Sequence, residues 1–184
     1  MSKKICILAL SLLFVSSLAF AEIIQEWYTN EEFAFKMLKL PGWKFREDVE
    51  DIMITLGFQD SFQNTLIINV TRLPKGADYF KGGDFISYND AVIDSATGKL
   101  NNLRFIKKPN TILINDVQVR EAVFEWEDEK HNNEKFTNIL MFFYPVETNS
   151  NIITVFVLFK CKSVEYPYIQ PHLEKSLTSI EISN

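Results

Sequence analysis

Two apolar segments, residues 136–144 and 152–159, most constrain how this chain of 184 residues can fold. Both are rich in β-branched and aromatic residues, and a polar, turn-forming sequence separates them, which is typical of two strands joined as a hairpin. Both alternating sets of side chains are apolar, so that Phe156 and Leu158 oppose Val157. A strand that is apolar on both faces must be covered on both faces, and the hairpin is therefore predicted to form the middle of a sheet. In that position Phe156→Asp is expected to unfold the protein by burying an unpaired charge.

Alternating patterns predict further strands. In residues 52–58, Ile54, Leu56 and Phe58 alternate with smaller or more polar residues, and this strand is expected to pair antiparallel with residues 66–70. Other strands are predicted over residues 33–37, 103–106, 112–114 and 117–126. The alternation in the last of these changes phase near Arg120-Glu121, which indicates a β-bulge.

Two segments have the features of helices. Residues 88–96 form a loosely periodic stretch that Gly98 ends. In residues 166–180 the apolar side chains fall at helical spacing, with Pro167 and Pro171 before or within the first turn. Together with the strands, these segments predict an α+β fold in which a central antiparallel β-sheet is covered by helices.

The first 21 residues have the three parts of an export signal. Lys3 and Lys4 form a basic start, residues 5–15 are almost wholly apolar, and Ala19-Phe20-Ala21 is the small-x-small pattern of a cleavage site. The apolar run is shorter than the roughly 20 residues that a membrane-spanning helix needs. We therefore expect a signal peptide over residues 1–21, cleaved after Ala21, and a single domain over residues 22–184 that is periplasmic or secreted. A lipid anchor is not expected, because Glu22 rather than a cysteine follows the cleavage site.

Composition excludes some classes of partner. The formal net charge of the chain is −5, and removal of the signal peptide with its two lysines makes it more negative. Apart from Lys107-Lys108, the basic residues after the signal are scattered singly, so neither a nucleic acid nor an anionic membrane surface is expected as a partner. No apolar run after the signal is long enough to span a membrane.

Few residues of the chain after the signal have the chemistry of an active site. Cys161 is its one cysteine, and so no internal disulfide can form. It is either a reactive or intermolecularly bridged thiol or an inert buried one, and the second alternative is favoured because free cysteines are among the most buried residues. His172 is expected at the surface of the last helix. No nucleophile motif or phosphate-binding loop is present, and the sequence predicts neither catalytic residues nor a cofactor.

A metal site is conceivable only in the acidic loop of residues 125–131, where carboxylates stand beside His131. The side chains in question are those of Glu127, Asp128, Glu129 and His131. The loop lacks the regular oxygen spacing and the glycine of a calcium-binding loop, which favours a solvated loop between two strands over a metal site.

Three segments carry a resemblance to a known family: residues 33–43 with their Pro-Gly-Trp turn, residues 113–126, and residues 173–182 at the end. The order of the segments along the chain resembles that of the family of the photosystem II subunit PsbP, the periplasmic protein DcrB and the Ran-binding Mog proteins. The resemblance implies a central antiparallel sheet with helices on both faces, an α/β/α sandwich. It implies an accessory or adaptor role, because the family has no shared set of catalytic residues. The export signal does not fit the Ran-binding or the photosystem role.

These observations favour one hypothesis, an exported, non-catalytic accessory or protein-binding domain of the bacterial cell envelope whose partner is another envelope protein or complex. Two alternatives stay open. One is an exported carrier of a small molecule or lipid, with an aromatic-lined cavity between sheet and helix. The other is a hydrolase that uses Cys161 or a carboxylate. The sequence does not identify the residues that would bind a partner.

Overall fold

The computed structural model describes residues 25–60, 62–78, 80 and 83–183, and the predicted signal peptide, residues 1–21, lies outside them. The main sheet has the strand order β3-β4-β5-β10-β8-β7-β6, every neighbouring pair being antiparallel. Its strands are β3 (Lys44–Val49), β4 (Met53–Gln59), β5 (Thr65–Pro74), β6 (Asn101–Ile114), β7 (Val117–Asp128), β8 (Glu134–Phe143) and β10 (Asn151–Lys162), and the short β9 (Val146–Glu147) also pairs with β10.

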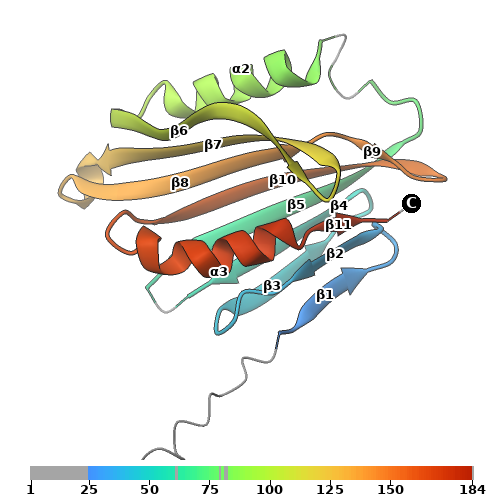
Figure 1. The fold of residues 1–184 in the computed structure, drawn as a ribbon, viewed down its shortest axis with the longest axis horizontal. Coiled ribbons are helices and arrows are strands. Elements are labelled where there is room, and N and C mark those ends of the chain that lie inside the picture. The colour runs from blue at the N-terminus through green and yellow to red at the C-terminus, as the bar shows by residue number, and fades with distance from the viewer. Residues whose placement is uncertain (1–24, 61, 79, 81–82, 184) are drawn as a thin grey trace, which may run out of the picture.

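A smaller sheet and two α-helices complete the described part (Figure 1). The smaller sheet has the order β1-β2-β11, and its strands are β1 (Trp27–Asn30), β2 (Phe35–Leu38) and β11 (Glu181–Ile182). The helices are α2 (Phe85–Thr97) and α3 (Tyr166–Thr178), and a short 3-10 helix, η1 (Glu129–His131), links β7 to β8. No helix in the described ranges combines the length and the apolar character needed to cross a membrane.

The predicted hairpin is the centre of the main sheet, as expected. β8 and β10 pair with each other, β10 also pairs with β5, and β8 also pairs with β7. Within β10, Val157 is fully buried between Ile68 and Met141 of the neighbouring strands. Phe156, on the opposite face, is half-buried and stacks on Phe142 with ring centroids 5.0 Å apart. The two faces of the central strand are therefore covered to different extents.

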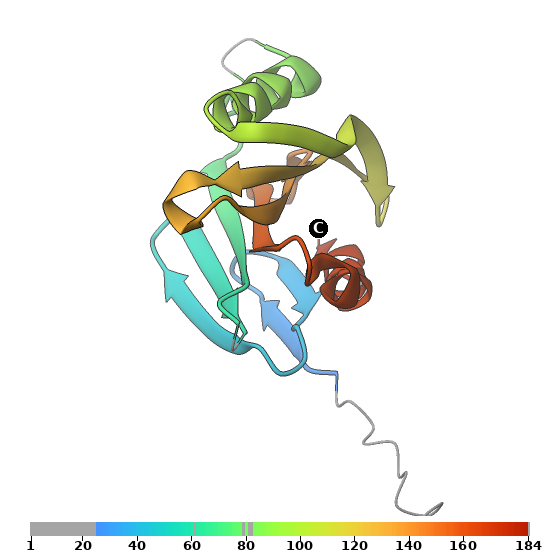
Figure 2. The same ribbon diagram turned by 90° about the vertical axis from the view of Figure 1, so that its left-hand side faces the viewer.

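The main core lies on one face of the sheet, between the sheet, α3 and the smaller sheet. Fully buried side chains meet there from all three layers, among them Phe159 of β10, Met37 of β2 and Leu173 of α3. On the other face a smaller apolar cluster joins Phe85 and Ile93 of α2 to strands β7 and β8. Figure 2 shows α2 at the β6–β7 end of the curved sheet and α3 within its concave side. The fold is α+β, and one of its two covering layers is itself partly a sheet.

Three predicted segments differ in detail. Residues 103–106 and 112–114 belong to one strand, β6, whose pairing with β7 shifts register three times and so interrupts the alternation of its side chains. Residues 33–37 do not join the main sheet, because the chain turns at Ala34 (φ 50°) and enters the smaller sheet as β2. The three register shifts of β6 affect only its pairing with β7. On its other side, β7 pairs with β8 without interruption.

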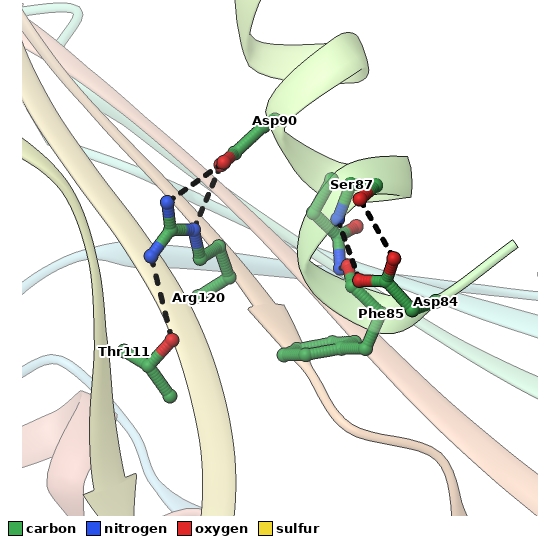
Figure 3. A network of polar contacts seen from close by, with 7 residues as sticks. Asp84, Phe85, Ser87, Asp90, Thr111 and Arg120 are labelled. Atoms are coloured by element: carbon green, nitrogen blue, oxygen red, sulfur yellow. Dashed lines mark hydrogen bonds and ion pairs between the residues drawn. The ribbon is translucent and has the colours of Figure 1, made fainter.

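The phase change near Arg120-Glu121 marks two charged side chains rather than a break in the β7–β8 pairing. Val119, Glu121 and Val123 point toward the main core, and Arg120 points toward α2. The guanidinium donates through Nε and a terminal nitrogen to the two carboxylate oxygens of Asp90, both at 2.8 Å (Figure 3). This bidentate pair ties α2 to the sheet.

The helix α2 begins at Phe85, before the predicted residue 88, because Asp84 caps it. The Ser87 backbone N–H donates to Asp84 Oδ1 (2.9 Å) and the Ser87 hydroxyl donates to Oδ2 (2.7 Å), as Figure 3 shows. These bonds hold the pKa of Asp84 below its usual value. A side chain that accepts from the first turn satisfies donors that no helical carbonyl can reach.

Asp90→Asn is expected to destabilise the protein by about 1–2 kcal/mol, since it leaves a largely buried guanidinium without its countercharge. The side chain of Arg120 is only 12% exposed. Urea denaturation measures the effect, and Glu181→Gln, which breaks the more exposed pair with Lys36, serves as the control with about 0.5 kcal/mol or less. Equal losses in the two variants would show that the Arg120–Asp90 pair does not anchor α2.

Candidate functional site

Cys161 lies in an environment that suppresses thiol chemistry. It is 1% exposed at the end of β10. Burial, together with the negative charges of Glu165 and Asp60, raises its pKa from 9.0 to about 12. A nucleophilic cysteine needs the opposite, a partly exposed and electropositive site. The structure therefore supports the inert alternative for this residue.

Neither histidine forms a catalytic pair with that thiol. Cys161 and His131 lie on the walls of one surface hollow of about 400 Å³. His131 Nδ1, however, is 2.9 Å from Asp128 Oδ2, and no hydrogen bond within the described chain joins it to Cys161. His172 is exposed on α3, as expected.

The acidic loop of residues 125–131 does not gather its carboxylates around one point. Asp128 accepts from the Lys130 backbone N–H (3.0 Å) and caps η1, while Glu125 and Glu127 lie within 4 Å of Lys135 Nζ. Among the described residues no group of three or more histidine, cysteine or acidic side chains could hold a metal ion. Of the side chains proposed as ligands from the sequence, Glu127, Asp128 and His131 thus take part in local caps or ion pairs, and Glu129 is exposed.

A more open surface lies on the main sheet, on the face opposite α3. There β4 and β5 present half-buried side chains, including Thr55, Ile67 and Asn69, while α2 packs at the far end of the sheet against β6 and β7. A hollow of about 570 Å³ is centred on this part of the sheet. We call this surface the open sheet face and define it by Lys44, Arg46, Gly57, Gln59, Thr65 and Ile67.

The hollow exists because Gly57 has no side chain. Its neighbours across the sheet are Arg46 in β3 and Ile67 in β5. A Cβ built on Gly57 would come no closer than 4.0 Å to any atom, so the strand has room for a side chain that the sequence omits. Glycine inside a strand often marks a place where another molecule approaches the backbone closely.

The rim of the hollow is positively charged. Lys44 and Arg46 are exposed on the edge strand β3, and neither has an ion-pair partner in the part of the chain that the structure describes. Ile67 supplies an apolar floor, and Gln59 and Thr65 supply polar groups at the side. A surface of this kind suits a polypeptide that carries an acidic side chain next to an apolar one.

A second, smaller cavity of about 210 Å³, which we call the α3 pocket, lies on the other face between α3 and strands β6 to β8. Its walls include Ile112, Ile139, Met141 and Leu177, with Lys107, Glu121, Tyr166 and Glu174 as its charged or polar groups. The sequence identified no binding residue in either place. Its only signals were a glycine within a strand and the change of phase at Arg120-Glu121.

The sequence matches no protein-family model and no curated protein. Solved structures do share its fold. LpqN, described as involved in cell envelope biogenesis of Mycobacterium tuberculosis, is 6% identical, with a TM-score of 0.59 over 89% of this chain and 88% of that one. The cyanobacterial PsbP of Synechocystis is 11% identical, with a TM-score of 0.53 over 89% and 95% of the two chains.

The Ran-binding protein Mog1p of Saccharomyces cerevisiae is a third structural neighbour, 8% identical with a TM-score of 0.50 over 89% of this chain and 97% of that one. These matches confirm the expected resemblance of the fold to that of the PsbP and Mog proteins. Identities this low show a common fold, and a common fold does not by itself establish a function.

Proposed function

We propose that this protein is an exported, non-catalytic accessory domain of the bacterial cell envelope that binds another envelope protein through the open sheet face. The domain is residues 22–184, released into the periplasm or the medium when the signal peptide is cleaved after Ala21. The hollow at Gly57 is the observation that carries the proposal. It is a preformed recess in a sheet whose opposite face carries the main core.

Charge complementarity defines the partner as a polypeptide with an acidic side chain at its contact point. Lys44 and Arg46 flank the hollow without intramolecular ion pairs in the described chain, so a carboxylate can approach them without breaking an existing contact. Charged groups at the rim of an interface chiefly raise the association rate and select the partner. The role of LpqN in cell envelope biogenesis supports an envelope partner.

The two alternatives have less support. A lipid carrier needs a large apolar cavity between sheet and helix. The α3 pocket has only about 210 Å³, whereas pockets for drug-sized ligands have roughly 300–1,000 Å³. A hydrolase that uses Cys161 needs a thiolate, and the buried thiol has a pKa of about 12.

Photo-crosslinking in intact cells tests the proposal. A photoreactive amino acid is placed at Gln59, on the rim of the hollow, and in a second strain at Ser95, on the exposed side of α2. We expect one envelope protein to be crosslinked from Gln59 and not from Ser95. The crosslink should disappear in Gly57→Ile, which fills the hollow with a side chain suited to a strand, and should persist in Ala91→Leu, which adds apolar bulk on α2.

Two further readouts complete the test. Amino-terminal sequencing of the protein from the periplasm or medium should begin at Glu22; a cytoplasmic protein that begins at Met1 would refute export. A crosslinked partner that is equally abundant from Gln59 and Ser95, or that is unaffected by Gly57→Ile, would refute the open sheet face as the binding surface.

A further inference from the structure

The α3 pocket contains a buried carboxylate, Glu121, among apolar walls and a few polar groups. Glu121 is 8% exposed and points from β7 toward the main core, between Val119 and Val123. Lys107 Nζ lies 3.5 Å from its Oε2. Its Oε1 has neither a hydrogen-bond donor nor a cation in the described part of the chain, and it is not among the fully buried oxygens that lack a partner there. This oxygen is therefore reachable from the pocket and free to accept a further donor.

The electrostatic surroundings of the α3 pocket favour a cation. Glu174 stands at its rim, and the last turn of α3, with Leu177 and Thr178, forms one wall. The carboxyl end of a helix carries a partial negative charge, which favours a cation nearby. Burial, with the negative charges of Glu174 and Glu121, raises the pKa of Tyr166 in the same pocket from 10.0 to about 12.

The α3 pocket is held in shape at one end. Asn115, in the tight turn between β6 and β7, donates from Nδ2 to the backbone carbonyls of Thr178 (3.2 Å) and Ile180 (2.7 Å). These bonds fix the end of α3 against the β6–β7 hairpin. A pocket that is already formed does not lose free energy by ordering itself around a ligand.

The resident cation, Lys107, is weakly held. Its side chain is 47% exposed, whereas that of Glu121 is 10% exposed, and their 3.5 Å separation is longer than a charge-assisted hydrogen bond. The apolar walls offer contacts for a methylene stem, and Tyr166 also lines the pocket, where an aromatic ring attracts a cation. The guanidinium of arginine is planar, weakly hydrated and able to bind a carboxylate with two parallel hydrogen bonds, unlike an ammonium group.

We infer that the α3 pocket receives the arginine side chain of a second polypeptide, whose guanidinium binds Glu121 and displaces Lys107. The volume of the pocket suits one long side chain. The α3 pocket and the open sheet face lie on opposite faces of the sheet, so this inference stands independently of the proposed function.

Titration of the folded protein with Nα-acetyl-arginine methylamide, followed by two-dimensional NMR, tests the inference. We expect saturable shifts confined to residues around the pocket, such as Ile112 and Thr178. The citrulline analogue, which has the same shape without the charge, should not bind, and the lysine analogue should bind about fivefold or more weakly because it cannot form the two parallel bonds.

Three variants make the test specific. Glu121→Gln should weaken arginine binding about tenfold or more, as expected when one partner of a desolvated charge pair is lost. Lys107→Gln should strengthen it about threefold or more, because the competing cation is gone. Glu129→Gln, an exposed carboxylate in η1, should leave it unchanged.

Each contrary result overturns the inference in a definite way. Equal binding of the arginine and citrulline analogues would show that Glu121 does not distinguish a charged ligand from a neutral one. Equal binding of the arginine and lysine analogues would refute the assignment of the ligand as arginine. Unchanged binding in Glu121→Gln, or weaker binding in Lys107→Gln, would place the cation elsewhere. If Glu121→Gln fails to fold, Glu174→Gln at the exposed rim takes its place and should weaken binding about twofold to fivefold.

Discussion

Val157→Asp is expected to abolish cooperative folding of the protein. Val157 is fully buried at the centre of the central strand, facing the main core. Among the described residues of the main core an aspartate there has no cation to pair with, and an uncompensated buried charge costs several kcal/mol. Small domains have only about 5–15 kcal/mol of stability in total. Far-UV circular dichroism and urea denaturation should show no folded baseline for the variant.

Phe156→Asp, one position earlier, is the matched control. The sequence pattern predicted that Phe156→Asp would unfold the protein. The structure instead makes Val157 the position where a charge is most damaging, because Phe156 lies half-buried on the less covered face. Its carboxylate could reach water, so the variant should fold and lose about 2–4 kcal/mol, mainly the contact with Phe142. If Val157→Asp were as stable as Phe156→Asp, the assignment of the main core to that face would be refuted.

Cys161 is expected to react with a chromogenic disulfide reagent about a thousandfold more slowly in the folded protein than in concentrated guanidinium chloride. At pH 8 a thiol with a pKa near 9 is about one-tenth thiolate, whereas one with a pKa near 12 is about one ten-thousandth thiolate. Burial also keeps the reagent away from the sulfur. Absorbance at pH 8 measures both rates.

A cysteine moved to the surface controls for the reagent. In the double variant Cys161→Ala/Ser95→Cys the thiol is exposed on α2 and should react at a similar rate with and without denaturant. Native Cys161 reacting within about tenfold of its unfolded rate would contradict an inert thiol and revive the hydrolase hypothesis.

The central part of the fold could be predicted from the sequence because its signals are local. The alternation in β4 and β5 and the two-faced apolar pattern of β8 and β10 each lie within one strand, and short connections join β4 to β5 and β8 to β10. The smaller sheet could not be predicted in this way. It depends on β2 pairing with β11 from the other end of the chain, and no local pattern encodes such a pairing. The continuity of β6 was hidden by its register shifts.

The candidate sites were visible in the sequence only as irregularities. Gly57 occupied a position in β4 where a side chain would be expected, but the sequence could not tell whether a helix covered that position. Glu121 appeared only as a charged residue that interrupts the alternation of apolar residues in 117–126. Its burial became clear only when α3, a segment from the end of the chain, was placed over it. Both candidate sites lie where the local sequence pattern and the tertiary structure disagree.

The pairing of β2 with β11 has a consequence for the order in which the protein folds. Lys36 and Glu181, opposite each other in these strands, are 145 positions apart. Contacts between distant positions form late, because the chain must first lose the entropy of closing the intervening loop. The main sheet can therefore assemble before its apolar concave face is covered by α3 and β11. During that interval the exposed apolar face makes the chain prone to aggregation. The risk ends when about the last eighteen residues, which form α3 and β11, pack onto that face.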